Sequence, residues 1–143
     1  VCDYYNANPT SVEAGLDLLT QVSRRGKDSA RVRRACLADM LELGAGEETM
    51  HRELAAKIIA LSVEHVLLYG PRMKWLEAEL TSRGYRGKLA HYPSQGELAE
   101  ALITEMKPGD AILIKGSRSM KMEEVWKVLQ NQLGASGGQA HPS

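Results

Sequence analysis

The chain has 143 residues, of which 43% are hydrophobic and 25% charged, a composition typical of one globular domain. Its 18 basic and 18 acidic residues give no net charge, which argues against a nucleic-acid-binding protein. No apolar run approaches the roughly 20 residues of a membrane span, and the pattern of a signal peptide is missing.

Short apolar runs alternate with amphipathic helical stretches along the chain. We expect the first helix from about Thr10 to Arg25, opened by Thr10 and Glu13 as a T-x-x-E capping box. The later elements are predicted as a strand at 34–38, a helix at 47–62, a strand at 65–69, a helix from Pro71 to Gly84, a strand at 88–92, a helix capped by Ser94 and Glu97, a strand at 111–115, and a last helix that begins near Ser119 or Met120.

The predicted strands are continuous apolar runs, which is typical of a sheet covered on both faces. The sequence therefore predicts an α/β fold, a three-layer αβα sandwich around a mostly parallel, Rossmann-like sheet. Ligands of such folds bind at the carboxyl ends of the strands, where three unusual loops are expected, at 6–11, 39–46 and 115–123. The two cysteines form no disulfide framework, which indicates a reducing compartment and hence the cytoplasm.

The first loop reads "NANPTS", and Pro9 restrains Asn8 to an extended conformation just before a helix. The amides of Asn6 and Asn8 thus lie near a helix N-terminus, whose free N–H groups favour an anion or a phosphate. The alternative is that both amides only hold the turn, because asparagine is a common turn residue. Composition alone favours this alternative.

The loop at 115–123 reads "KGSRSMKME" and combines two cations with two hydroxyl groups at the end of a buried strand. Such a combination before a helix is suited to bind a carboxylate or a phosphate. A solvated turn with incidental charges is an equally good interpretation. The residues of interest are Lys115, Gly116, Ser117, Arg118 and Ser119.

The loop at 39–46 reads "DMLELGAG" and carries Asp39 and Glu42, with His51 in the helix that follows. A carboxylate and a histidine at one edge of the sheet could orient a polar substrate, or they could brace the loop. We favour bracing. The spacing fits no zinc motif.

Three motifs taken together, "DYYNANPTS", "ADMLELG" followed by His51, and "KGSRSMKMEEV", resemble the C-terminal domain of the Mur ligases. The resemblance extends from Asp3 to about Leu133, and the motifs are most similar to those of the family's D-Ala-D-Ala-adding ligases. The sister ligases for other amino acids carry different residues in the first and third motifs. The middle motif departs at Ala38, where the family usually has glycine.

The resemblance implies that residues 1–133 are one domain of a longer three-domain chain, with 134–143 as a flexible tail. In the family, ATP phosphorylates the terminal carboxylate of UDP-MurNAc-tripeptide, the amine of D-Ala-D-Ala attacks the acyl phosphate, and phosphate leaves. ATP is bound with Mg²⁺ mainly by the central ATPase domain, through a P-loop. Because no P-loop occurs in these 143 residues, we expect this domain alone to be inactive and to act by closing over the central domain.

The resemblance also assigns roles to residues. The nucleotide would be approached by Asp3, Asn6, Asn8 and Pro9. The substrate-binding candidates are Lys115, Ser117, Arg118, Ser119, Asp39 and His51, with Arg118 first and Lys115 second for the carboxylate of the dipeptide. Asp39 and Glu42 are candidates to accept the proton of the amine, Glu123 is expected to brace the Arg118 loop, and no metal ligand is expected in this domain.

Three other interpretations share the predicted fold. One is a stand-alone nucleotide- or metabolite-binding α/β module, which would begin near Val1 with its own start codon. Another is a sister Mur or folylpolyglutamate-type ligase with a different amino acid substrate, since a few loop residues can change specificity. The last is a structural interaction domain, for which removal of the Arg118 charge would have no effect.

Overall fold

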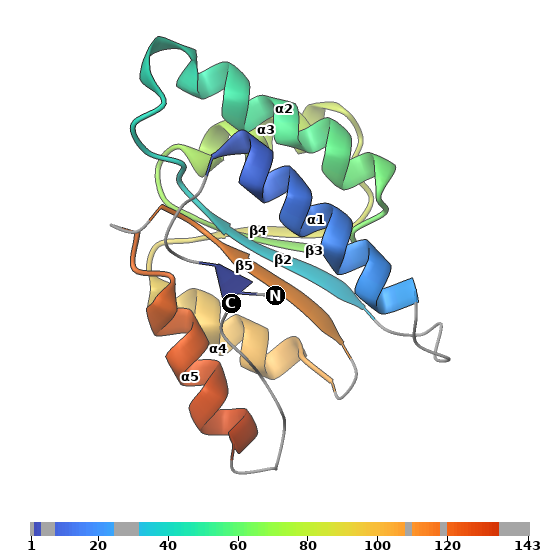
Figure 1. Cartoon of the computed structure of the whole chain (residues 1–143), viewed down its shortest axis with the longest axis vertical. Coiled ribbons are helices and arrows are strands. Elements are labelled where there is room, and N and C mark those ends of the chain that lie inside the picture. Colours follow the sequence, from blue (N-terminus) through green and yellow to red (C-terminus); the bar gives the residue numbers. More distant parts are fainter. Residues whose placement is uncertain (1, 4–7, 25–31, 108–109, 118–119, 135–143) are drawn as a thin grey trace.

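The computed structural model describes residues 2–3, 8–24, 32–107, 110–117 and 120–134, and Figure 1 shows its elements. In chain order these are β1 (Cys2–Asp3), α1 (Pro9–Arg24), β2 (Arg33–Ala38), a 3₁₀ turn (Gly44–Gly46), α2 (Glu47–Ala60), β3 (His65–Tyr69), α3 (Met73–Ser82), β4 (Lys88–Tyr92), α4 (Gln95–Glu105), β5 (Ala111–Lys115) and α5 (Glu123–Gly134). Within these residues, no helix combines the length and the apolar character that crossing a membrane requires.

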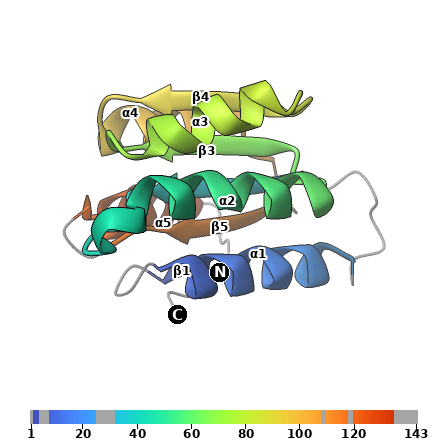
Figure 2. The same ribbon diagram turned by 90° about the horizontal axis from the view of Figure 1, so that it is seen from above.

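The described strands form one parallel sheet in the order β1-β5-β2-β3-β4. Helices α1, α2 and α3 cover one face, while α4 and α5 cover the other (Figures 1 and 2). This confirms the predicted three-layer αβα sandwich with a parallel sheet. The chain leaves β5 toward one face but leaves its neighbours β1 and β2 toward the other. The carboxyl end of β5 is thus a topological switch point, where α/β proteins bind ligands.

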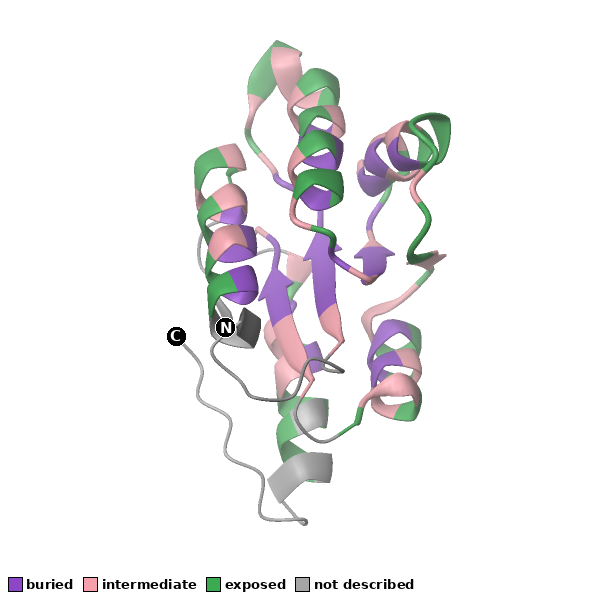
Figure 3. Cartoon of the chain, turned by 90° about the vertical axis from the view of Figure 1, so that its right-hand side faces the viewer, coloured by how far each residue is buried: buried purple, intermediate pink, exposed green. Residues whose placement is uncertain are grey.

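Two apolar clusters hold the layers together, one on each face of the sheet. The larger cluster, beneath α1, α2 and α3, is built around Leu16, Leu54, Ile58, Leu68 and Leu76. The smaller one, beneath α4 and α5, is built around Cys36, Leu67, Leu98, Leu102 and Met122. Helices cover both faces of the sheet, so the strands at its centre are buried. β2 and β5 become more buried toward their carboxyl ends (Figure 3), and this burial holds the start of the loops that follow them in place.

Three helix starts differ from the sequence-based expectation. The first helix begins at Pro9 with Asn8 before it, so the predicted Thr10–Glu13 capping box is wrong. Pro71 lies in a turn, and α3 begins only at Met73.

The last helix begins at Glu123 rather than near Ser119 or Met120. A short turn in which the Met120 N–H donates to the Ser117 carbonyl at 2.8 Å comes before it. The predicted cap of α4 is confirmed, because the Ser94 Oγ accepts from the Glu97 N–H at 3.2 Å. Residues 135–143 of the predicted tail lie outside the described part of the chain.

Candidate functional site

The loops after β2 and β5 are joined into one surface at the carboxyl end of the sheet. The Ser117 N–H donates to the Asp39 carbonyl at 3.1 Å, and the Ser117 Oγ accepts from the Leu41 N–H at 2.7 Å. Gln95, the first residue of α4, donates from Nε2 to the Met120 carbonyl at 3.0 Å. These bonds bring together two loops that are about 75 residues apart in the sequence.

Asp39 is the centre of this arrangement, and its side chain is completely buried. One carboxylate oxygen accepts from the Met73 N–H at 3.1 Å, and the other accepts from the Arg72 N–H at 3.1 Å. Both N–H groups belong to the start of α3, whose positive end favours a carboxylate. The position of Asp39 therefore matches a brace between the β2 loop and α3, the role that we favoured from the sequence, because both of its oxygens accept hydrogen bonds from within the chain.

Arg72 extends this brace to α2. Its Nη1 lies 3.4 Å from the second Asp39 oxygen, and its Nε donates to Glu47 Oε2 at 2.8 Å. The hydrogen bond to Glu47, followed by the interaction with Asp39, raises the pKa of Arg72 above its ordinary value. Since two carboxylates face this one guanidinium, Arg72 is a link between loops and not a free anion receptor.

His51 lies at the same edge of the sheet and is fully buried in the first half of α2. Its Nε2 accepts from the Met40 N–H at 3.0 Å, and its Nδ1 lies 2.6 Å from the Glu47 carbonyl. This pairing requires the neutral tautomer with the proton on Nδ1. Trp75 packs against the ring edge-on, with 5.6 Å between centroids. Both ring nitrogens are thus engaged within the chain, and through Nε2 the ring supports the β2 loop.

Gly116 explains how the chain accommodates alanine at position 38. A Cβ on Gly116 would lie 2.8 Å from the Ala38 Cβ and 2.8 Å from the Met122 Cγ, closer than atoms of packed side chains approach. The missing side chain therefore lets β5 and the start of α5 close over Ala38.

Lys115 is only 4% exposed and has an interaction partner within the chain. The absence of a side chain on Gly15 lets α1 approach β5, since a Cβ there would lie 2.8 Å from the Leu113 Cδ1, and the Lys115 Cε lies near the same position, at 3.4 Å. In the sheet, Lys115 is in register with Leu37 on one side and with Asp3 on the other. A buried, partnered lysine is a weaker candidate for the substrate carboxylate than the sequence indicated.

Asn8 forms the N-cap of α1 through a reciprocal pair of hydrogen bonds. Its Oδ1 accepts from the Ser11 N–H at 2.9 Å, and the Ser11 Oγ accepts from the Asn8 N–H at 3.1 Å. Pro9 follows as the first helical residue, where its missing N–H costs nothing. The amide oxygen thus holds the turn, which leaves the amide nitrogen as the group that could meet a ligand.

Several predicted site residues cannot be compared with the structure. Asn6, Arg118 and Ser119 lie outside the described residues, as does the side chain of Asp3. Glu42 is described: it is exposed, with a backbone φ of 61°. Within the described residues, no group of three His, Cys, Asp or Glu side chains could hold a metal ion.

Two residues of this edge, Arg72 and Gln95, were not predicted as part of the site. Arg72 follows β3, which pairs with β2, and Gln95 follows the edge strand β4, so the parallel topology already indicated that both lie at the carboxyl edge. Their specific partners depend on tertiary packing and had no signal in the sequence.

A family model described as the glutamate ligase domain of Mur ligases matches residues 1–118. The chain therefore belongs to the Mur ligase family, within which it corresponds to that domain. It is similar to UDP-N-acetylmuramoyl-tripeptide–D-alanyl-D-alanine ligases. The Bacillus subtilis enzyme is 35% identical over 127 residues, 89% of this chain and 27% of that enzyme. The Rickettsia prowazekii enzyme is 31% identical over 125 residues, 87% of this chain and 26% of that enzyme.

Two solved structures of MurF are also similar to this chain. A MurF structure from Acinetobacter baumannii has a TM-score of 0.72 and 26% identity, covering 90% of this chain and 26% of that one. The MurF ligase of Thermotoga maritima, solved in complex with ADP, also has a TM-score of 0.72. It is 23% identical, which supports the fold alone, and covers 94% of this chain and 28% of that one. The chain thus spans about a quarter of the length of its relatives.

Proposed function

We propose that this chain is the C-terminal domain of an ATP-dependent ligase that adds D-Ala-D-Ala to UDP-MurNAc-tripeptide during peptidoglycan precursor synthesis in the cytoplasm. The observation that carries the proposal is the joining of the loops after β2 and β5 at the switch point around β5, in a domain whose relatives are ligases of this name. The alternatives are a stand-alone binding module and a sister ligase.

In this proposal the domain closes over the central ATPase domain of the same protein. Closure would exclude water and bring the amine to the activated carboxylate of the tripeptide. ATP supplies the phosphoryl group that forms the acyl phosphate, and Mg²⁺, which shields the phosphates, would be held mainly by the central domain. The 143 residues alone are therefore proposed to be inactive.

The residues of this domain divide into two groups in the proposal. Ser117, Arg118 and Ser119 hold the dipeptide, with Arg118 as the cation for its carboxylate and Lys115 second. Asp39 and His51 hold the loop after β2 in place. Asp3, Asn6, Asn8 and Pro9 face the ribose and phosphates of the nucleotide.

The first experiment measures phosphate release by the complete protein with ATP, Mg²⁺ and UDP-MurNAc-tripeptide, with and without D-Ala-D-Ala. We expect release to depend on the dipeptide. Arg118→Ala should raise the KM for D-Ala-D-Ala by at least tenfold, because a charge-assisted hydrogen bond is lost. Lys121→Ala, which removes an exposed cation of the same loop, serves as the matched control.

Two results would contradict the proposal. Release that is independent of the dipeptide in a folded protein would favour a sister ligase with another amine. An unchanged KM in Arg118→Ala would exclude Arg118 as the carboxylate-binding residue.

The nucleotide role of Asn8 can be separated from its capping role. Asn8→Asp keeps the oxygen that caps α1 but replaces the amide nitrogen by a negative charge. We expect unchanged thermal stability of the domain and a raised KM for ATP in the complete protein. Unchanged ATP kinetics would leave Asn8 with the capping role alone.

A further inference from the structure

The carboxylates at the carboxyl edge differ in what they contact. Asp39 and Glu47 are engaged by the start of α3, through backbone N–H groups and Arg72. The Glu124 Oε1 atom lies 3.7 Å from the Lys127 Nζ atom. Glu42 and Glu123 are among the described carboxylates of this edge for which no such partner is found.

Burial distinguishes these two. Glu42 is exposed, so water can solvate its charge. The Oε2 atom of Glu123 is buried and has no hydrogen-bond partner among the described residues. A buried carboxylate oxygen without a donor is costly, and native proteins seldom retain one without a reason.

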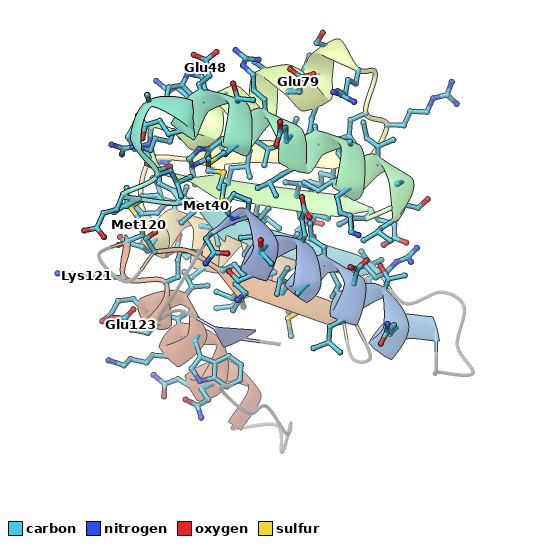
Figure 4. The ribbon with its side chains drawn as sticks, turned by 45° about the horizontal axis from the view of Figure 1, so that its top comes forward. Met40, Glu48, Glu79, Met120, Lys121 and Glu123 are labelled. Atoms are coloured by element: carbon cyan, nitrogen blue, oxygen red, sulfur yellow. The ribbon has the colours of Figure 1, made fainter. Side chains whose placement is uncertain are left out.

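The backbone next to Glu123 is held by hydrogen bonds on both sides, while the residue as a whole is half-buried. The turn before it is fixed on one side by the bond from Gln95 to the Met120 carbonyl and on the other by the Glu124 N–H, which donates to the Lys121 carbonyl at 3.0 Å. Lys121 adopts a φ of 54°, a conformation that non-glycine residues rarely take. Figure 4 shows Met120, Lys121 and Glu123 on the same side of the molecule, at the start of α5.

Two described cations of this edge are not paired with Glu123. Arg72 is shared by Asp39 and Glu47, and Lys121, although two residues away, is exposed and forms no ion pair with it. The described residues thus present a buried acceptor atom, Glu123 Oε2, without a donor, at the edge where the proposed reaction must hold an amine.

We propose that Glu123 binds the ammonium group of the incoming amine substrate. The inference rests on the proposed function and adds a residue to the same site. An ammonium offers three N–H donors and a positive charge, which match a buried carboxylate oxygen. Glu123 would hold the ammonium nitrogen in place beside the acyl phosphate in the step before the attack. This role replaces the brace expected from the sequence.

The test compares two ligands of the complete protein that differ only in the amine. D-Ala-D-Ala carries the ammonium, whereas propionyl-D-alanine keeps the peptide and the carboxylate but lacks the amine. In Glu123→Gln we expect the KM for D-Ala-D-Ala to rise at least tenfold, while the inhibition constant of propionyl-D-alanine changes less than twofold. Glu124→Gln, one residue along the same helix, should change neither value.

Other outcomes would overturn the inference. Equal weakening of both ligands in Glu123→Gln would make Glu123 a brace for its loop, and no change in either would remove it from the site. If Glu123→Gln does not fold, Glu123→Asp, which withdraws the carboxylate by one methylene, must show the same selective loss. If the wild-type protein releases phosphate at the same rate with and without D-Ala-D-Ala, the proposed function is wrong, and this inference is wrong with it.

Discussion

The Asp39 carboxylate lies at the end of β2 with no exposed surface, and its two oxygens accept from the backbone N–H groups of Arg72 and Met73. In this position one residue joins the β2 loop to the start of α3. Its energetic importance follows from burial, because hydrogen bonds to a charged group count for more when water cannot replace them.

Asp39→Asn tests this bracing role. Asparagine keeps one oxygen but places an NH₂ group against a backbone N–H, so we expect the free energy of unfolding to fall by about 2–3 kcal/mol. Urea unfolding of the domain measures the difference. Glu42→Gln, an exposed carboxylate of the same loop, is the control and should change stability by less than about 0.5 kcal/mol. A loss that small in Asp39→Asn would contradict the brace.

His65 gives a second prediction, at the opposite end of the sheet. It is buried on β3 between Arg34 and Lys88, its register neighbours on β2 and β4. Burial, aided by these two cations and opposed by Glu105, lowers its pKa from 6.5 to about 4. Between these values the unfolded chain binds more protons than the folded one, so stability is retained above pH 6.5 and falls as the pH drops toward 4.

The size of the effect is at most about 3 kcal/mol for a shift of this magnitude. The measurement is the difference between wild type and His65→Leu in urea unfolding at a series of pH values, because other groups also titrate near pH 4. We expect the wild type to lose stability relative to the variant between pH 6.5 and 4. A constant difference over that range would show that His65 does not titrate abnormally.

At the scale of the elements, the approach of β5 and α5 to the end of β2 depends on the pair Gly116 and Ala38. The two positions are almost 80 residues apart, yet a Cβ on Gly116 would lie 2.8 Å from the Ala38 Cβ. The packing of the β5 loop is thus decided by a contact between strands.

Gly116→Ala is expected to destabilise the domain by about 1–3 kcal/mol, because the added methyl group overpacks a fixed site. Ala38→Gly should recover part of this loss in the double variant by removing the opposing methyl group. A double-mutant cycle in urea unfolding measures the coupling between the two sites. Additive losses would show that the loop relaxes away from Ala38 and that the contact does not constrain it.

At the scale of the whole molecule, the main question is how this domain behaves in isolation, since the chain covers about a quarter of the length of its relatives. An open hollow of about 680 Å³ lies at the amino end of the sheet, lined among others by Ile59, Tyr85 and Lys88, and none of the described motif residues lines it. In the proposed function, the ligand surface at the carboxyl end is completed by closure against another domain.

We accordingly expect this chain alone to bind ATP more than tenfold more weakly than the complete protein, and to release no phosphate from it. Isothermal titration with ATP and Mg²⁺ on both proteins provides the comparison. Tight binding by the 143 residues alone would contradict the closure model and favour a stand-alone nucleotide-binding module.

The sequence by itself determined the order of the elements, the parallel sheet and the family. Continuous apolar strands and amphipathic helices are local patterns, and the motifs at 3–11 and 115–123 are contiguous, so each can be read without its neighbours. Helix starts were less accurate: Asn8 caps α1 in place of Thr10, because capping depends on which N–H groups a side chain reaches.

Only the tertiary structure decided what the polar residues at the carboxyl edge contact. Asp39 and His51 have the right chemistry for a substrate site, but hydrogen bonds to α2, α3 and the β2 loop engage both Asp39 oxygens and both His51 nitrogens. Glu123 was expected to brace the Arg118 loop, and the lack of a partner for its Oε2 atom follows only from the packing of α5 in the folded domain. Hydrogen-bond satisfaction is a property of the folded neighbourhood, which a linear motif does not contain.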